Sequence, residues 1–276
     1  MSEASKRLHH LQRKVIGCQL CPRLVQWREQ VAKKKVARYG GWDYWGKPVP
    51  SFGDPNARLL VVGLAPAAHG GNRTGRMFTG DRSGDWLYRT LYKFGFANQA
   101  TSVSRDDGLL LHDCYITASA RCAPPKNKLL PRELKDCRPY LLQEFQLLRN
   151  VRVIVALGKV AFDTVFDAFR ELELTSMPKR PMFRHGKEYQ LNNHQILIAS
   201  YHPSQQNTFT GKLTEKMFDA VFRRAGRILG HRAALNSPCS PSLNKRGTLP
   251  SLLKRRVRDE FRIRSLNHKS DIIYGF

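Results

Sequence analysis

Long apolar stretches are absent from this chain of 276 residues. The first residues contain no continuous apolar core of the kind found in signal peptides. No later stretch approaches the roughly 18 uncharged apolar residues of a membrane-spanning helix. We therefore expect a cytoplasmic protein that does not act in or on a membrane.

Acidic residues are scarce. The chain has 22 Asp and Glu against 47 Lys and Arg, which gives a formal net charge of +25. With 41% hydrophobic residues the chain can form a large core, so disorder throughout is excluded. A cationic surface of this size favours a partner that carries phosphates, because each Lys or Arg placed near a phosphate releases condensed counterions. Nucleic acid is the expected partner class.

The known nucleotide-binding glycine motifs are also missing. Residues 63–86 are rich in glycine, but they contain neither the Gly-Lys-Ser/Thr ending of a P-loop nor a Gly-x-Gly-x-x-Gly pattern. We therefore do not expect ATP or NAD. The polar, charged and aromatic side chains of this segment instead indicate a binding pocket; they are His69, Asn72, Arg73, Arg76, Phe78 and Asp81. The alternatives are a mobile surface loop and, for Asp81, a cap on a helix that begins near Gly84 or Asp85.

Four short apolar runs predict buried strands, at residues 59–63, 114–118, 151–157 and 195–200. Segments with helical spacing lie between them, and another is expected over residues 212–229. This alternation predicts an α/β protein with a parallel sheet, helices on both faces, and ligand sites in the loops beyond the carboxyl ends of the strands. Residues 1–230 are expected to form this domain. Residues 231–276, rich in Ser, Pro and basic residues, are expected to be a flexible tail.

The loop after the last predicted strand also contains side chains suited to chemistry. His202 stands at the end of that strand, followed by Pro203 and a run of polar residues. A histidine there can donate a hydrogen bond to a developing anion or move a proton. The alternative is a solvated turn.

Cysteines supply a third group of candidates. In a reducing compartment disulfides are not expected, so Cys18-x-x-Cys21 together with Cys122 and Cys137 favours a metal site. The ligand type does not separate zinc from an iron–sulfur cluster, and two unrelated buried pairs are the alternative. Cys114 is expected in the core and Cys239 as a free thiol in the tail.

Taken together, the two cysteine pairs and the segments at residues 63–81, 121–128 and 202–208 resemble the type-5, or family B, uracil-DNA glycosylases. The resemblance spans about residues 10 to 230. It implies a three-layer αβα sandwich with a four-stranded parallel sheet and a structural 4Fe–4S cluster on Cys18, Cys21, Cys122 and Cys137. It also implies a monofunctional DNA repair hydrolase that excises uracil, and other deaminated or damaged bases, from double-stranded DNA.

The resemblance also suggests roles for particular residues. Asp81 and His202 would be catalytic, with Asp81 orienting water and His202 donating to uracil O2. Phe78 would stack on the flipped base and Asn127 would read its edge, in a pocket completed by Gly63, Leu64 and Ala65. Apart from the resemblance, the cations beside these loops and the polar run after His202 predict the DNA contacts, which are Arg73, Arg76, Lys126, Ser204, Gln205, Gln206 and Asn207.

Two other functions fit parts of this pattern. A non-catalytic DNA-binding module with a metal or cluster would account for the charge and the cysteines, but it would not need Asp81, Asn127 or His202. The other cluster-bearing family of uracil glycosylases has an acidic residue where this chain has Leu64 and Ala65. We expect a monomeric enzyme.

Overall fold

The computed structural model describes residues 3–231. The predicted tail, apart from its first residue, and Cys239 lie outside this part. Its elements are α1 (Glu3–Ile16), α2 (Pro22–Lys34), η1 (Ala37–Tyr39), β1 (Phe52–Gly53), β2 (Leu59–Gly63), α3 (Gly71–Thr74), α4 (Arg82–Lys93), β3 (Cys114–Ala118), η2 (Pro125–Asn127), α5 (Pro131–Leu147), β4 (Val153–Leu157), α6 (Lys159–Glu171), β5 (Glu188–Gln190), β6 (Ile196–Ser200), α7 (Gln205–Phe209) and α8 (Glu215–Ile228).

The four predicted strands form the centre of one sheet. Its order is β1-β3-β2-β4-β6-β5, and β3, β2, β4 and β6 are mutually parallel. The short strands β1 and β5 pair antiparallel at the two edges, so the sheet has six strands rather than four. Strands of two or three residues have no recognisable alternation of their own, and only the edge of the existing sheet defines them.

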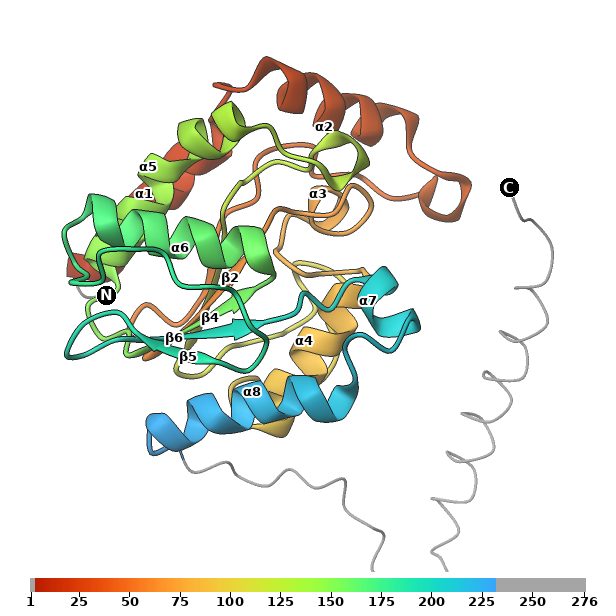
Figure 1. The fold of residues 1–276 in the computed structure, drawn as a ribbon. Helices are drawn as coiled ribbons and strands as arrows, with labels where there is room; N and C mark the ends of the chain where they lie inside the picture. Colours follow the sequence, from red (N-terminus) through yellow and green to blue (C-terminus); the bar gives the residue numbers. More distant parts are fainter. Residues whose placement is uncertain (1–2, 232–276) are drawn as a thin grey trace, which may run out of the picture. The chain divides into compact units, whose positions relative to one another are not determined.

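Helices cover both faces of the sheet, which confirms the three-layer αβα prediction. Figure 1 shows α1, α5 and α6 on one side and α4 and α8 on the other. Each face has its own apolar core, because successive strand residues point to opposite sides: Leu60 and Val62 pack with the first group of helices, Leu59 and Val61 with the second. Each of these four side chains is fully buried.

Helix starts follow local chemistry. Asp81, Ser204 and Thr214 cap α4, α7 and α8, each accepting a hydrogen bond from a backbone N–H of the first turn. The helix predicted over 212–229 therefore begins at Glu215.

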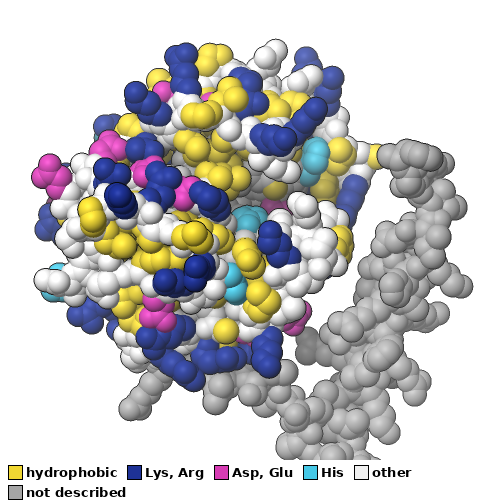
Figure 2. Space-filling view, viewed as in Figure 1, with side chains coloured by type: hydrophobic (Ala, Val, Ile, Leu, Met, Phe, Trp, Pro, Cys, Tyr) yellow, Lys and Arg dark blue, Asp and Glu magenta, His cyan; other side chains and the backbone are white. Residues whose placement is uncertain are grey.

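Basic side chains are spread widely over the surface. On the face shown in Figure 2, Lys and Arg side chains clearly outnumber Asp and Glu. Within residues 3–231, no helix combines the length and the hydrophobicity that crossing a bilayer requires.

Candidate active site

A cavity of about 390 Å³ opens beyond the carboxyl ends of β2 and β6. Ligands bind at this edge of a parallel α/β sheet because the connecting loops gather there. Separate chain segments contribute the lining residues, which are Leu64, Ala65, Pro66, Ala67, Met77, Phe78, Asp81, Arg82, Ser83, Asn127, His202, Ser204 and Gln205. The two predicted catalytic residues thus share one cavity with Leu64, Ala65, Phe78 and Asn127.

Phe78 is held in a left-handed backbone conformation, with φ = 53°. Few non-glycine residues adopt this conformation unless the surroundings impose it. The ring lies against Gly63, where an added Cβ would come within 2.6 Å of the Phe78 Cζ atom. It stacks on His202 with ring centroids 6.0 Å apart. The missing side chain at Gly63 therefore leaves room for the Phe78 ring. Phe78 as a whole is 9% exposed.

Asp81 serves two purposes at once. Its Oδ1 accepts a hydrogen bond of 3.0 Å from the Gly84 N–H as the cap of α4, while the same side chain lines the cavity. The other oxygen lies above Gly70, where an added Cβ would be 2.0 Å from Oδ2. Burial raises the pKa of Asp81 to about 6, so the carboxylate is mostly ionised at pH 7 but titrates near neutrality.

His202 follows the end of β6, and no charged side chain of residues 3–231 pairs with its ring. Burial lowers its pKa to about 4, so the imidazole is neutral at pH 7 and carries a single N–H donor. Its backbone carbonyl accepts a hydrogen bond of 2.9 Å from the Asn207 side chain. The Asn207 side chain therefore holds the His202 backbone in place.

Asn127 reaches the cavity from the loop between β3 and α5. Lys126 and Asn127 have φ = 52° and 55°, two consecutive non-glycine residues in the left-handed region. Both are exposed. Among residues 3–231, the carboxamide of Asn127 has no hydrogen-bond partner, so both its donor and its acceptor are available.

Arg73 and Arg76 occupy different positions from those expected of phosphate ligands. Both are only 3% exposed. Arg73 lies between the rings of Tyr39 and Trp42, at 4.0 and 4.2 Å from their centroids, and Arg76 pairs with Asp107 at 2.8 Å. Both buried guanidinium groups hold the glycine-rich segment in place through contacts within the protein. Their burial does not support the predicted DNA contacts.

Four of the other predicted DNA contacts lie at α7: Ser204 is its N-cap, and Gln205, Gln206 and Asn207 belong to the helix. Ser204 and Gln205 line the cavity and Gln206 is exposed beside them. Arg82, which was not predicted, also lines the cavity; its Nε donates to Thr208 Oγ1 at 3.1 Å and its guanidinium lies 4.1 Å from the centroid of Phe209. Only its position next to Asp81 could have indicated it from sequence.

The four cysteines predicted as ligands surround one small pocket. Cys18 and Cys21 precede α2, with Cys21 as its N-cap, Cys122 follows β3, and Cys137 lies in α5. All four are free thiols. Burial, with smaller contributions from neighbouring thiols, raises the pKa of Cys137 to about 12 and that of Cys21 to about 11, so a metal would have to displace their protons.

Within the described residues, no group of three or more His, Cys, Asp or Glu is arranged to hold a single metal ion. One zinc ion needs its thiolates about 2.3 Å from a common centre. In a cluster each cysteine binds a different iron, so its ligands stand farther apart around a shared space. Four thiols around one pocket form a donor set that suits either kind of centre.

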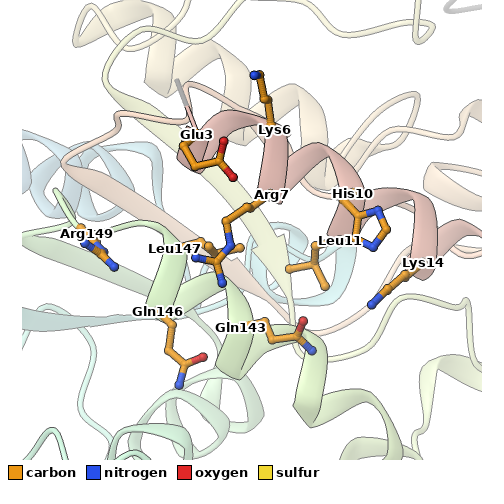
Figure 3. A pocket seen from close by; sticks show the side chains of 10 residues that line it. All are labelled: Glu3, Lys6, Arg7, His10, Leu11, Lys14, Gln143, Gln146, Leu147 and Arg149. Carbon is orange, nitrogen blue, oxygen red and sulfur yellow. The ribbon is translucent and has the colours of Figure 1, made fainter. Parts of the chain in front are cut away.

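A second hollow, of about 630 Å³, lies between α1 and α5 (Figure 3). It is lined by exposed basic and amide side chains such as Lys6, Arg7 and Gln143, and by none of the predicted site residues. The smaller cavity at the sheet edge is therefore the candidate active site.

Comparison with known proteins identifies the family of the chain. Residues 50–226 match the uracil DNA glycosylase superfamily. A protein of Thermus thermophilus named type-5 uracil-DNA glycosylase is 50% identical over 214 residues, covering 78% of this chain and 94% of that protein. A protein of the same name from Pyrobaculum aerophilum is 45% identical over 217 residues, covering 79% and 91%.

A type-4 uracil-DNA glycosylase of Archaeoglobus fulgidus is more distant, at 28% identity over 188 residues, with 67% of this chain and 83% of that protein covered. The higher identities confirm the resemblance drawn from the sequence. The chain belongs to the uracil DNA glycosylase superfamily, in its type-5 branch.

Proposed function

We propose that this protein excises uracil from double-stranded DNA by hydrolysing the N-glycosidic bond, leaving an abasic site. One observation carries the proposal: Phe78, Asp81, Asn127 and His202, from three separate loops, line the same cavity. A pure DNA-binding module has no use for a carboxylate and a neutral imidazole facing one small cavity.

The target bond lies inside the stacked duplex, so the nucleotide must rotate out before it can react. Phe78 offers an aromatic face inside the cavity. Stacking of a base on an aromatic side chain contributes about 1–3 kcal/mol, which offsets part of the cost of unstacking. Leu64 and Ala65 would complete the apolar wall around the base.

Asn127 is the proposed reader of the base edge. Its carboxamide presents a donor and an acceptor in one plane, which is what the uracil edge requires. A site built to pair with uracil would leave these groups unmatched against cytosine, which is the basis for discrimination.

His202 is the proposed donor to uracil O2. When the bond between C1′ and N1 breaks, its electron pair passes to the base and negative charge develops at O2. A neutral imidazole N–H placed there stabilises this charge without itself titrating near pH 7.

Asp81 is the proposed partner of the attacking water. Its carboxylate opposes the positive charge that develops on the sugar and accepts a hydrogen bond from the water. The water oxygen bonds to C1′, and its proton passes to the carboxylate and on to solvent or the departing base.

Exposed side chains at the cavity rim would contact the DNA. Arg82 and Lys126 are exposed cations that would meet phosphates on either side of the flipped nucleotide. Ser204, Gln205 and Gln206 lie on the α7 side. A glutamine inserted into the vacated stack would bond the orphaned partner base instead of only filling space.

We also propose that Cys18, Cys21, Cys122 and Cys137 hold a 4Fe–4S cluster with a structural role. Such a cluster would cross-link α2, the loop after β3, and α5. The supporting observation is the four free thiols around one pocket. Iron and acid-labile sulfide in equal amounts in anaerobically purified protein would agree with this, and zinc in place of iron would contradict it.

The proposal extends to the setting of the reaction. The enzyme would act as a monomer on chromosomal DNA, which lies in the cytoplasm of a prokaryote. Other deaminated bases that fit the cavity, hypoxanthine among them, are candidate substrates.

Single-turnover excision from a duplex with one U·G pair tests the site. Asp81→Asn keeps the cap, because Asn caps helices as well as Asp does, but removes the negative charge. We expect both Asp81→Asn and His202→Ala to bind the duplex normally and to cleave about 100-fold or more slowly, as is typical when a general acid–base group or an oxyanion donor is lost.

Asp106→Asn is the matched control, since Asp106 is an exposed carboxylate that does not line the cavity. It should cleave at the wild-type rate. Equal losses in all three variants, or none in the two site variants, would contradict the assigned roles. Binding without cleavage by folded wild type would favour the DNA-binding module.

A further inference from the structure

The loop that carries Asn127 has an unfavourable backbone conformation. Two adjacent non-glycine residues, Lys126 and Asn127, are left-handed, and this persists only where surrounding contacts impose it. Within the loop, the Asn127 and Lys128 amides donate to Pro124 and Pro125 carbonyls at 3.2 and 3.1 Å. These local bonds form a single 3-10 turn, so the position of that turn must be fixed from outside.

Arg23 provides that outside contact. It lies in the first turn of α2, more than 100 residues away in the chain, and its Nη2 donates to the Lys128 carbonyl at 3.0 Å. The same guanidinium holds both oxygens of Glu133, each at 2.7 Å. Glu133 in turn accepts a 2.7 Å bond from the Leu130 N–H.

These bonds enclose the downstream half of the loop. Arg23 donates to the carbonyl of Lys128, the residue after Asn127. Glu133 accepts from the N–H of Leu130, where the loop enters α5. Glu133 has a side chain only 6% exposed, whereas that of Arg23 is 38% exposed. A planar fork with several donors is needed to reach two acceptors in fixed directions, which a lysine cannot do.

We propose that Arg23 is a positioning residue for uracil recognition, because it fixes the turn that aims the Asn127 carboxamide into the cavity. This inference rests on the proposed function and deepens it. Arg23 does not line the cavity, so it acts through Asn127.

A double-mutant cycle tests this directly. We expect Arg23→Gln to slow single-turnover uracil excision by about 10-fold and to reduce the preference for uracil over cytosine, while affinity for undamaged duplex stays unchanged. Asn127→Ala should have the larger effect. Adding Arg23→Gln to Asn127→Ala should cause no further loss, because the arginine then has nothing left to position.

Arg13→Gln is the matched control. Arg13 is an exposed arginine on α1, away from the Asn127 loop. The substitution is the same and removes one positive charge, so excision should stay at the wild-type rate. Arg23→Lys should recover only part of the activity. If Arg23→Gln proves unstable, Glu133→Gln weakens the same clamp from the other side and should shift the same readouts.

Hydrogen exchange at the Asn127 and Lys128 amides gives a readout independent of catalysis. In Arg23→Gln these amides should exchange about 10-fold faster at unchanged melting temperature. Unchanged exchange, or losses that multiply in the double mutant, would overturn the inference. Failure of wild type to release uracil would instead overturn the proposed function, while the exchange result would still decide the role of Arg23.

Discussion

Gly70 lies directly beneath the carboxylate of Asp81, and this contact can be tested by adding one methyl group. An alanine Cβ at this position would be 2.0 Å from Oδ2, so the carboxylate would have to move. We expect Gly70→Ala to fold but to excise uracil at least about 10-fold more slowly, because misplacement by an ångström suffices for such losses. Single-turnover kinetics measure the effect.

Gly41→Ala is the control for that change. Nothing lies within 4 Å of an added Cβ at Gly41, and its φ is not left-handed. This variant should excise uracil at the wild-type rate. A wild-type rate in Gly70→Ala as well would contradict a role for the exact position of the Asp81 carboxylate.

The pH dependence of excision should follow Asp81. Its pKa is raised to about 6, and only the ionised form can accept a proton from water, so the single-turnover rate should fall as pH drops through about 6. His202, with a pKa lowered to about 4, stays neutral through this range and contributes no slope. The slower residual rate of Asp81→Asn should be flat between pH 5 and 7; a retained inflection near 6 would assign the titration to another group.

At the residue scale, a functional residue could be recognised where a reactive side chain stands at a strand end or in a glycine-rich loop. His202 at a strand end and Asp81 in a glycine-rich loop could be recognised, and the structure places both on one cavity. Arg73 and Arg76 are predicted to contact DNA because they are cations in the glycine-rich loop, but both are buried. Their aromatic and acidic partners, such as Tyr39 and Asp107, are too distant in sequence for burial to have been foreseen.

At the scale of elements, a fully buried ion pair joins the loop after β3 to α5. Arg121 Nη2 contacts Glu144 Oε2 at 2.6 Å, and Thr117 donates to the same oxygen at 2.6 Å. Glu144→Gln removes the charge and leaves the Arg121 guanidinium buried without a counterion. We expect the free energy of unfolding to fall by about 3–5 kcal/mol in urea denaturation.

Glu171→Gln is the comparison for that prediction. Glu171 forms an exposed pair with Arg138, so its loss should cost no more than about 1 kcal/mol. Similar losses in both variants would show that burial does not set the energy of the Arg121–Glu144 pair.

The central strands could be predicted because continuous β-branched and aliphatic runs suit strands buried on both faces. The edge strands could not, since β1 and β5 have only two and three residues. The helices α1 and α2 were not predicted, although Leu8, Leu11 and Val15 repeat at helical spacing. In a segment with so many charged residues, this narrow apolar stripe is a weak signal of a helix. The contact of α1 with α5 shows what the stripe packs against.

At the scale of the whole molecule, the charge of +25 predicts DNA binding that weakens steeply with salt. If six phosphates are neutralised, log K should fall against log salt with a slope of about −5.

Deleting residues 232–276, a basic segment outside the described residues, should reduce DNA affinity and leave the single-turnover rate unchanged. Fluorescence anisotropy across salt concentrations measures the slope for the full chain and the DNA affinity of the shortened one. A slope near zero would contradict a role for phosphate contacts.

Identification of the product tests the central claim most directly. Wild-type protein in excess over a duplex with one U·G pair should release free uracil, detected by mass spectrometry, together with an equal amount of alkali-labile abasic strand. The same duplex with C·G in place of U·G should release no base. Intact DNA bound to folded protein, with no free uracil, would contradict the account and leave a DNA-binding module in its place.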